Sequence, residues 1–295
     1  MEKVSAFLRR KDIVFSPKRY FIDAMSAMAQ GLFCTLLVGT ILNTLGTQLH
    51  IGFLTDIIVT LGKGDGAVGY TIGALASAMV GPGIAVAIGF ALHCPTLVLF
   101  SLIPVGFAAN AMGGAGGPLA VLFVAILAAE LGKAVSKETK IDILVTPLVT
   151  IGVGVALSAW WAPAIGAAAS AFGQLIKDAT VLQPFWMGIL VSALMGIILT
   201  LPISSTAICA GLGLVGLAGG ACVAGCSAHM VGFAVSSYRE NGVQGLLSQG
   251  LGTSMLQVPN LVKKPILWLP PVVASIVNGP LATCLFKLQM NGAAI

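Results

Sequence analysis

The chain has 295 residues, of which 57% are hydrophobic and only 8% are charged, and its mean hydropathy is +1.01. A soluble domain of this size could not cover so much apolar surface with so little charge, which excludes an ordinary globular protein. The apolar runs are long and unbroken, so they indicate helices and not the short alternating strands of a β-barrel. We therefore predict an all-α, polytopic membrane protein with about ten transmembrane helices of roughly 20 residues each, some of them broken or re-entrant.

The net charge of +5 is concentrated in residues 1–20, which read as a basic, amphipathic segment at the membrane surface. The positive-inside rule places this segment in the cytoplasm. Its basic residues are Lys3, Arg9, Arg10, Lys11, Lys18 and Arg19. No basic surface interleaved with aromatic residues occurs elsewhere, so nucleic acid is not an expected partner.

A first transmembrane repeat is predicted over residues 21–160. Its expected spans are 21–46, 67–92, 96–112, 118–135 and 141–160. Residues 50–62 are short and mixed in character, so they are expected to lie in the interface or to enter the bilayer only partway.

A less hydrophobic connector at 161–182 leads to a second repeat at 183–287 and a C-terminal tail at 288–295. The spans expected in this half are 184–200, 204–220, 221–237, 243–260 and 266–286. With the N-terminus inside, Lys263 and Lys264 fall on the outside, against the positive-inside rule.

The two halves resemble each other weakly. The stretch GLFCTLLVGTILN from Gly31 matches GILVSALMGIILT from Gly188, and GFALH ending at His93 matches GCSAH ending at His229. Two repeats of five spans each would have opposite topology, an arrangement typical of secondary transporters with a site near the membrane midplane. Such an inversion would also explain the position of the two lysines.

Candidate binding residues are polar groups beside helix breaks, because polar groups inside a membrane are costly and irregular backbone is tolerated only where it lines a cavity or is buried. We predict a polar cavity formed mainly by the second half, for a small polar solute such as a sugar. Its expected walls include Ser204, Ser205, His229, Glu240, Asn241 and Ser254, with His93, Asn110 and Gln249 as further candidates. No catalytic residue and no cofactor are expected.

Several of these residues have a structural alternative. His229 could equally be a neutral histidine bonded to a neighbouring helix, and Glu240 could equally form a surface pair with Arg239. Glu130 is expected in an ion pair at a helix end, with Lys133 and Lys137 as candidate partners.

The six cysteines lie in apolar segments, which favours buried free thiols over a disulfide framework. Cys222 and Cys226 are four residues apart and, with His229, form only half of a metal site. No second pair of ligands follows, so no metal is expected. There is also no Walker motif and no nucleotide-binding glycine fingerprint, so the chain does not drive transport with its own ATPase.

Three stretches carry a resemblance to a known family. They are SPKRYFIDAMSAMAQGLFCTLLVGTILNTLG at 16–46, LPISSTAICAGLGLVGLAGG at 201–220, and HMVGFAVSSYRENGVQGLLSQGLGTSMLQVPNLVKKP at 229–265. They resemble the stand-alone subunit IIC of phosphotransferase-system (PTS) sugar transporters. The resemblance implies a multi-pass protein of the bacterial cytoplasmic (inner) membrane, a homodimer, and a permease that translocates a sugar.

In such a system, phosphate would reach the sugar from phosphoenolpyruvate through separate cytosolic IIA and IIB subunits. Two other functions stay open at this point. One is a secondary transporter or channel for another small solute without phosphoryl transfer, and the other is a membrane sensor or regulator that keeps a transporter fold.

Overall fold

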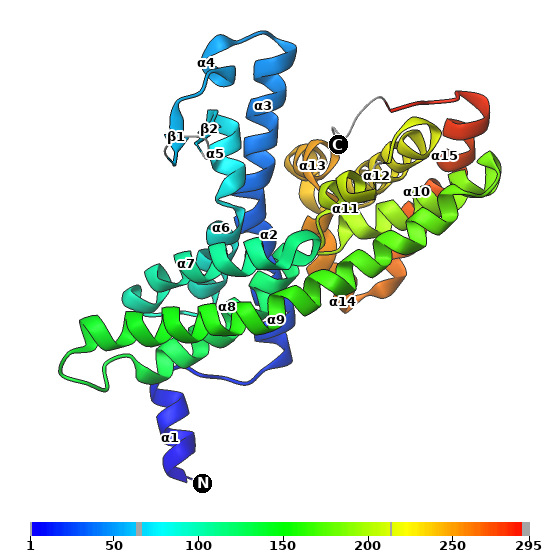
Figure 1. Cartoon of the computed structure of the whole chain (residues 1–295). Coiled ribbons are helices and arrows are strands. Elements are labelled where there is room, and N and C mark those ends of the chain that lie inside the picture. Colours follow the sequence, from blue (N-terminus) through cyan, green and yellow to red (C-terminus); the bar gives the residue numbers. More distant parts are fainter. Residues whose placement is uncertain (1, 63–66, 213, 291–295) are drawn as a thin grey trace.

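The computed structural model describes residues 2–62, 67–212 and 214–290. Two groups of helices are joined by one long helix, α9 (Asp142–Thr180), which runs beside both of them (Figure 1). Its first part packs against the helices of the first half and its last part against those of the second half. The two halves are therefore held in contact by a continuous element.

The N-terminal part begins with α1 (Glu2–Arg10), which projects away from the rest of the molecule (Figure 1). A nearly continuous helical run of 31 residues then covers Lys18–Gln48 and corresponds to the span predicted at 21–46. The run is composed of η1 (Lys18–Asp23), α2 (Ala24–Leu32), η2 (Phe33–Leu37) and α3 (Val38–Gln48).

The segment that follows this run, predicted at 50–62 to be short and mixed in character, is not a membrane-spanning helix. It contains α4 (Gly52–Thr55) and an antiparallel hairpin of β1 (Val59–Leu61) and β2 (Val68–Tyr70). The chain then re-enters the body through α5 (Ile72–Ala78) and α6 (Val80–Ala91), which are bent by 54° relative to each other. The side chain of Thr71 caps α5 by accepting the backbone N–H of Ala74 at 3.1 Å.

Two further helices of the first half form a hairpin. They are α7 (Thr96–Gly113) and α8 (Gly117–Val135), separated by the short η4 (Gly114–Gly116). Gly114 has φ 50°, a backbone conformation that a residue without a Cβ adopts at no steric cost. Because α7 and α8 pack against each other, the apolar run Thr96–Val135 folds back on itself. With 18 and 19 residues, each of the two helices is long enough to cross a bilayer.

The helix α9 differs from the sequence expectation. The predicted span at 141–160 and the predicted connector at 161–182 are both parts of this one helix of 39 residues. Its second part is rich in alanine, the residue with the highest helix propensity, and it carries Ile176 and Ala179 into the core of the second half. In the apolar 18-residue stretch of α9 that would cross a membrane, only 22% is buried inside the protein. The exposed remainder needs the bilayer as its solvent.

The second half is built around three helices that pack against one another: α10 (Pro184–Thr200), α12 (Gly216–Ser236) and α15 (Leu269–Pro280). Gly188 and Gly279 let α10 and α15 approach closely, because a Cβ on Gly279 would lie 2.0 Å from the carbonyl oxygen of Gly188. Shorter elements fill the intervals: α11 (Ser205–Leu212), α13 (Tyr238–Leu247), η5 (Ser248–Gly252), η6 (Ser254–Gln257), α14 (Val258–Lys263), η7 (Pro265–Trp268) and η8 (Leu281–Leu285).

These short elements change the expected spans of this half. The stretch 204–220 is not one helix but α11 followed by the start of α12, and 243–260 is divided among α13, η5, η6 and α14. Gly216, at φ 61°, lies where α12 begins after the break from α11, and the extended backbone of Thr253, at φ −154°, separates η5 from η6. Gly242, at φ 58°, interrupts the helical backbone within α13 itself.

The described residues contain five helical runs long and apolar enough to cross a membrane, with the α7–α8 hairpin counted as one run, or six if the bent α5–α6 pair is one span. The shorter α10, an apolar helix of 17 residues, comes in addition. The helical, membrane-spanning fold is thus confirmed, while the total of ten spans and the inverted repeat stay predictions. His93 lies exposed after the end of α6, whereas His229 lies buried within α12, so the local surroundings of this predicted pair differ.

Candidate functional site

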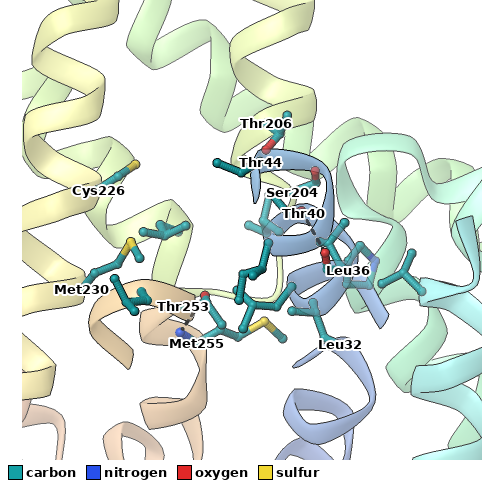
Figure 2. A pocket seen from close by; sticks show the side chains of 18 of the residues that line it. Leu32, Leu36, Thr40, Thr44, Ser204, Thr206, Cys226, Met230, Thr253 and Met255 are labelled. Carbon is teal, nitrogen blue, oxygen red and sulfur yellow. Dashed lines mark hydrogen bonds between the residues drawn. The ribbon is translucent and has the colours of Figure 1, made fainter. Parts of the chain in front are cut away.

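A cavity of about 600 Å³ lies between the two halves (Figure 2). Its walls in the first half come from the α2–α3 run, the start of α6 and the region around the α7–α8 turn. Its walls in the second half come from the C-terminal end of α10, from α11 and α12, and from the segment 251–255. The volume falls within the range typical of small-molecule sites.

The polar groups in this cavity are mostly hydroxyls. Thr40 and Thr44 lie one helical turn apart on α3, and Ser204 and Thr253 come from the second half (Figure 2). Ser204 Oγ accepts the backbone N–H of Ala207 at 3.2 Å, and Thr253 Oγ1 accepts that of Met255 at 3.2 Å. A hydroxyl that accepts one hydrogen bond still has its own hydrogen to donate.

The second-half hydroxyls lie where the backbone leaves the helical conformation. Ser204 follows Pro202 in the turn after α10, and its backbone N–H donates to the carbonyl oxygen of Ala115 at 2.9 Å. Thr253 has extended backbone, with φ −154°, between η5 and η6. Ser204 and Thr253 are therefore polar groups that lie beside a helix break and line the cavity.

The remaining surface of the cavity is apolar. Leucine, isoleucine, valine and methionine side chains make up most of it, and Cys226 and Met230 approach from α12 on the side opposite the α2–α3 run (Figure 2). None of the described residues that line it carries a charge. An ion would lose its hydration there without gaining a counter-charge, so the cavity favours a neutral occupant.

Of the residues predicted from the sequence, Ser204 and Asn110 line this cavity. Ser205, the next residue in the chain and the first of α11, is buried and does not line the cavity. Ser254 is fully buried, and its hydroxyl lies 2.8 Å from the hydroxyl of Thr200 on α10. Ser254 therefore anchors the wall that carries Thr253.

His229 is fully buried among α10, α12 and α15, outside the lining of the cavity. Its Nδ1 lies 2.8 Å from Ser275 Oγ and 3.2 Å from the carbonyl oxygen of Gly225. The ring occupies space left by Gly196, where a Cβ would lie 2.0 Å from Nδ1. This is the arrangement of the structural alternative, a histidine bonded to a neighbouring helix.

The structure places four other candidates away from the cavity. Glu240 and Asn241 are exposed on α13, and His93 is exposed after α6. Gln249 belongs to a buried amide chain, in which it donates to Ser237 Oγ at 3.1 Å and accepts from Gln257 Nε2 at 3.0 Å. This chain holds the irregular segment η5–η6 in place.

Sequence reasoning missed Thr40 and Thr44 as site residues. They lie within a helix and not beside a break, so the search for polar groups next to glycine and proline passed over them. The available signal was their spacing of four residues, which puts two hydroxyls on one face of a transmembrane run.

A separate charged cluster ties the N-terminal segment to the end of α8. The predicted pair is confirmed: Lys133 Nζ lies 2.9 Å from Glu130 Oε2, an ionic contact whose geometry does not qualify as a hydrogen bond. Lys133 also donates to the carbonyl oxygens of Asp12 at 3.0 Å and Leu92 at 3.1 Å. Arg19 bonds to the Asp12 carboxylate at 2.7 Å and holds the pKa of that carboxyl below its usual range.

Further ion pairs join the N-terminal segment to the turn after α8. Glu138 lies 2.6 Å from Arg10 and 2.5 Å from Lys11. The N-terminal segment and residues 130–138 therefore lie on the same side of the molecule. Among the described residues, no group of three or more His, Cys, Asp or Glu side chains is arranged to hold a metal ion.

A family model described as "Phosphotransferase system, EIIC" matches residues 22–295. No curated protein and no solved structure matches the chain.

Proposed function

We propose that this chain, which belongs to the phosphotransferase system EIIC family, binds one neutral sugar in the cavity between its two halves and carries it across the membrane. EIIC proteins are the membrane permease components of PTS sugar transporters, so the resemblance read from the sequence is confirmed at that level. The observation that carries the proposal is an uncharged cavity with hydroxyl groups contributed by both halves.

The lining suits the chemistry of a sugar. Sugar hydroxyls both donate and accept, as do the hydroxyls of Thr44, Ser204 and Thr253. The hydroxyl of Thr40 donates to the carbonyl oxygen of Leu36 at 2.8 Å and keeps its lone pairs to accept from a sugar. The apolar remainder of the wall contacts the C–H groups of a sugar ring and keeps the site largely free of water. A phosphorylated sugar would bring a charge into this surrounding at high cost, so the same site that accepts the sugar would release its phosphate ester.

The position of the cavity suits transport. Because its walls come from two groups of helices, a movement of one group against the other would open it first to one side of the membrane and then to the other. The segment η6–α14 lies at this junction: Met255 and Val258 belong to the second half in sequence but pack into the core of the first half.

The remaining expectations extend this proposal. We propose a homodimer in the bacterial cytoplasmic membrane with a cytoplasmic N-terminus, served by separate IIA and IIB subunits. The domain limits 1–20, 21–160, 161–182, 183–287 and 288–295 stay a prediction about repeats; residues 291–295 lie outside the described residues. Within the site, Ser204 and Asn110 are proposed as contacts.

The test is a thermal-shift screen of the purified protein, because a ligand that binds only the native state raises its apparent stability. The panel contains neutral sugars, polyols and the corresponding sugar phosphates. We expect a shift with a neutral sugar and none with its phosphate. A preference for the phosphate or for another charged metabolite would contradict the proposal.

Uptake into proteoliposomes then distinguishes transport coupled to phosphorylation from transport of unmodified sugar and from binding without transport. With IIA, IIB and phosphoenolpyruvate present, we expect the sugar to accumulate as its phosphate. Uptake of unmodified sugar under the same conditions would indicate transport without phosphoryl transfer, and binding without uptake would indicate a sensor. Either outcome would contradict the phosphotransferase route.

A further inference from the structure

Three cysteines of the second half form a thiol cluster behind the wall of the cavity. Cys209 lies on α11, and Cys222 and Cys226 lie one helical turn apart on α12. The sulfur atoms of Cys209 and Cys222 are 3.3 Å apart. The exposed fractions of these two side chains are 1% and 0%, so the pair is enclosed by protein.

We propose that Cys209 and Cys222 are an oxidisable pair, and that a peroxide converts them to a disulfide that fastens α11 to α12. The sulfur atoms need to approach by only about 1.2 Å to reach the usual S–S bond length of about 2.05 Å. Both thiols are free in the structure, which makes it the reduced form of the pair.

The reaction balances with hydrogen peroxide as the oxidant. One thiol, as its thiolate, attacks a peroxide oxygen, which breaks the O–O bond, gives a sulfenic acid and releases hydroxide that takes up the thiol proton to become water. The second sulfur then attacks the sulfenic sulfur, forms the S–S bond and displaces a second water. The two thiols lose two electrons and two protons in total, and one peroxide becomes two waters.

The cavity gives this pair a route to small oxidants. Buried thiols are otherwise inert. Cys226 lines the cavity and belongs to the same helix face as Cys222, so a small molecule in the cavity comes within one helical turn of the pair.

The bond would act on the wall of the cavity. Ser204 and Thr206, at the start of α11, line it, and Ser204 is joined through its backbone N–H to Ala115 beside the α7–α8 turn. A bond from Cys209 to α12 would remove the freedom of α11 to move relative to α12. This consequence for transport rests on the proposed function, whereas formation of the bond does not.

The chemical test uses the purified full chain in detergent. After treatment with hydrogen peroxide, the protein is denatured, the reactive thiols are counted with a maleimide, and cross-linked peptides are identified by mass spectrometry. We expect two fewer reactive thiols and a Cys209–Cys222 peptide pair that dithiothreitol releases. The Cys209→Ala variant should lose that product, and the matched Cys226→Ala variant should keep it.

Three results would overturn the proposal that Cys209 and Cys222 form a disulfide. They are no loss of thiols, a bond between Cys222 and Cys226 instead, or loss confined to the exposed Cys34 and Cys284. Replacing Cys34 and Cys284 with alanine beforehand removes bonds between molecules as a source of error.

The functional test compares uptake by reduced and oxidised protein in proteoliposomes. We expect oxidation to lower the uptake rate at least tenfold, dithiothreitol to restore it, and the Cys209→Ala variant to be insensitive. A disulfide that forms without changing uptake would overturn its effect on transport. If the reduced protein transports no sugar at all, the proposed function fails while the thiol count still decides the pair.

Discussion

Replacing Lys133 with methionine should destabilise the protein more than any other loss of a single charge among the described residues. The Lys133 side chain is 1% exposed, and its ammonium group contacts Glu130 and two backbone carbonyl oxygens. Methionine has similar length and fills the space, so the substitution removes the charge and the donors but leaves little cavity. Glu130, whose side chain is 9% exposed, would be left as a buried carboxylate without its counter-charge.

The expected magnitude follows from these contacts. Removing one partner of a buried ion pair costs about 3–5 kcal/mol. The carbonyl oxygen of Leu92 keeps its bond from Arg19 at 2.6 Å, so only the Asp12 carbonyl loses its donor. That second loss is partly relieved by water, which places the expected cost of Lys133→Met at about 3 kcal/mol, the lower end of the range.

A double-mutant cycle tests this reasoning. The free energy of unfolding in detergent is measured for Lys133→Met, Glu130→Gln and the double variant, with the exposed Lys140→Met as the control. The double variant should be more stable than the sum of the single changes predicts, because it leaves no unpaired buried charge. The reasoning is refuted if Lys133→Met costs no more than Lys140→Met, or if the two single effects simply add.

Three further predictions follow from the fold. Gly279→Ala should strongly lower the melting temperature, because its Cβ would lie 2.0 Å from the carbonyl oxygen of Gly188; an unchanged melting temperature would contradict the α10–α15 packing. Asp12 has a lowered pKa in the folded protein, first through its hydrogen bond from Arg19, so its contribution to stability is present at neutral pH and is lost as the pH falls below about 4. The protection of residues 6–15 against hydrogen exchange, relative to the intrinsic exchange rate at each pH, should then fall in the wild type, and an Asp12→Asn variant should show the low protection already at pH 7. A Lys137→Cys variant should be labelled by an impermeant thiol reagent from the same side as a cysteine near the N-terminus; labelling from opposite sides would contradict the contacts of Glu138 with Arg10 and Lys11.

The features that could be predicted from the sequence are local. Hydropathy predicted the helical membrane protein, and short-range charge spacing predicted the Glu130–Lys133 pair. The family was identified from residues 16–46, 201–220 and 229–265, within or overlapping the matched range. Each of these depends on composition or on neighbours along one stretch of chain.

The features that were missed depend on contacts between distant segments. Thr44 and Ser204 both line the cavity although they are far apart in the sequence. The sequence around either residue therefore gives no sign that the other lies nearby. His229 stands out as a polar residue in an apolar run, but its environment is set by Gly196 and Ser275 on two other helices. The length of α9 was missed because its second part is less hydrophobic, although its alanine content favours helix.

The most direct measurement of the central claim is the sugar affinity of four variants, two inside the cavity and two outside it. Thr44→Val and Ser204→Ala each remove a hydroxyl from the cavity, whereas Glu240→Gln changes an exposed carboxylate outside it. Thr47→Val, on the same helix as Thr44 but outside the cavity lining, controls for the substitution itself.

Losing one hydrogen bond to a sugar hydroxyl costs about 1–3 kcal/mol, which corresponds to a loss of affinity of about fivefold to about 150-fold. We predict that loss for Thr44→Val and Ser204→Ala, and wild-type affinity for Glu240→Gln and Thr47→Val. Normal binding by Thr44→Val and Ser204→Ala, together with loss of binding by Glu240→Gln, would contradict the account and place the sugar at α13.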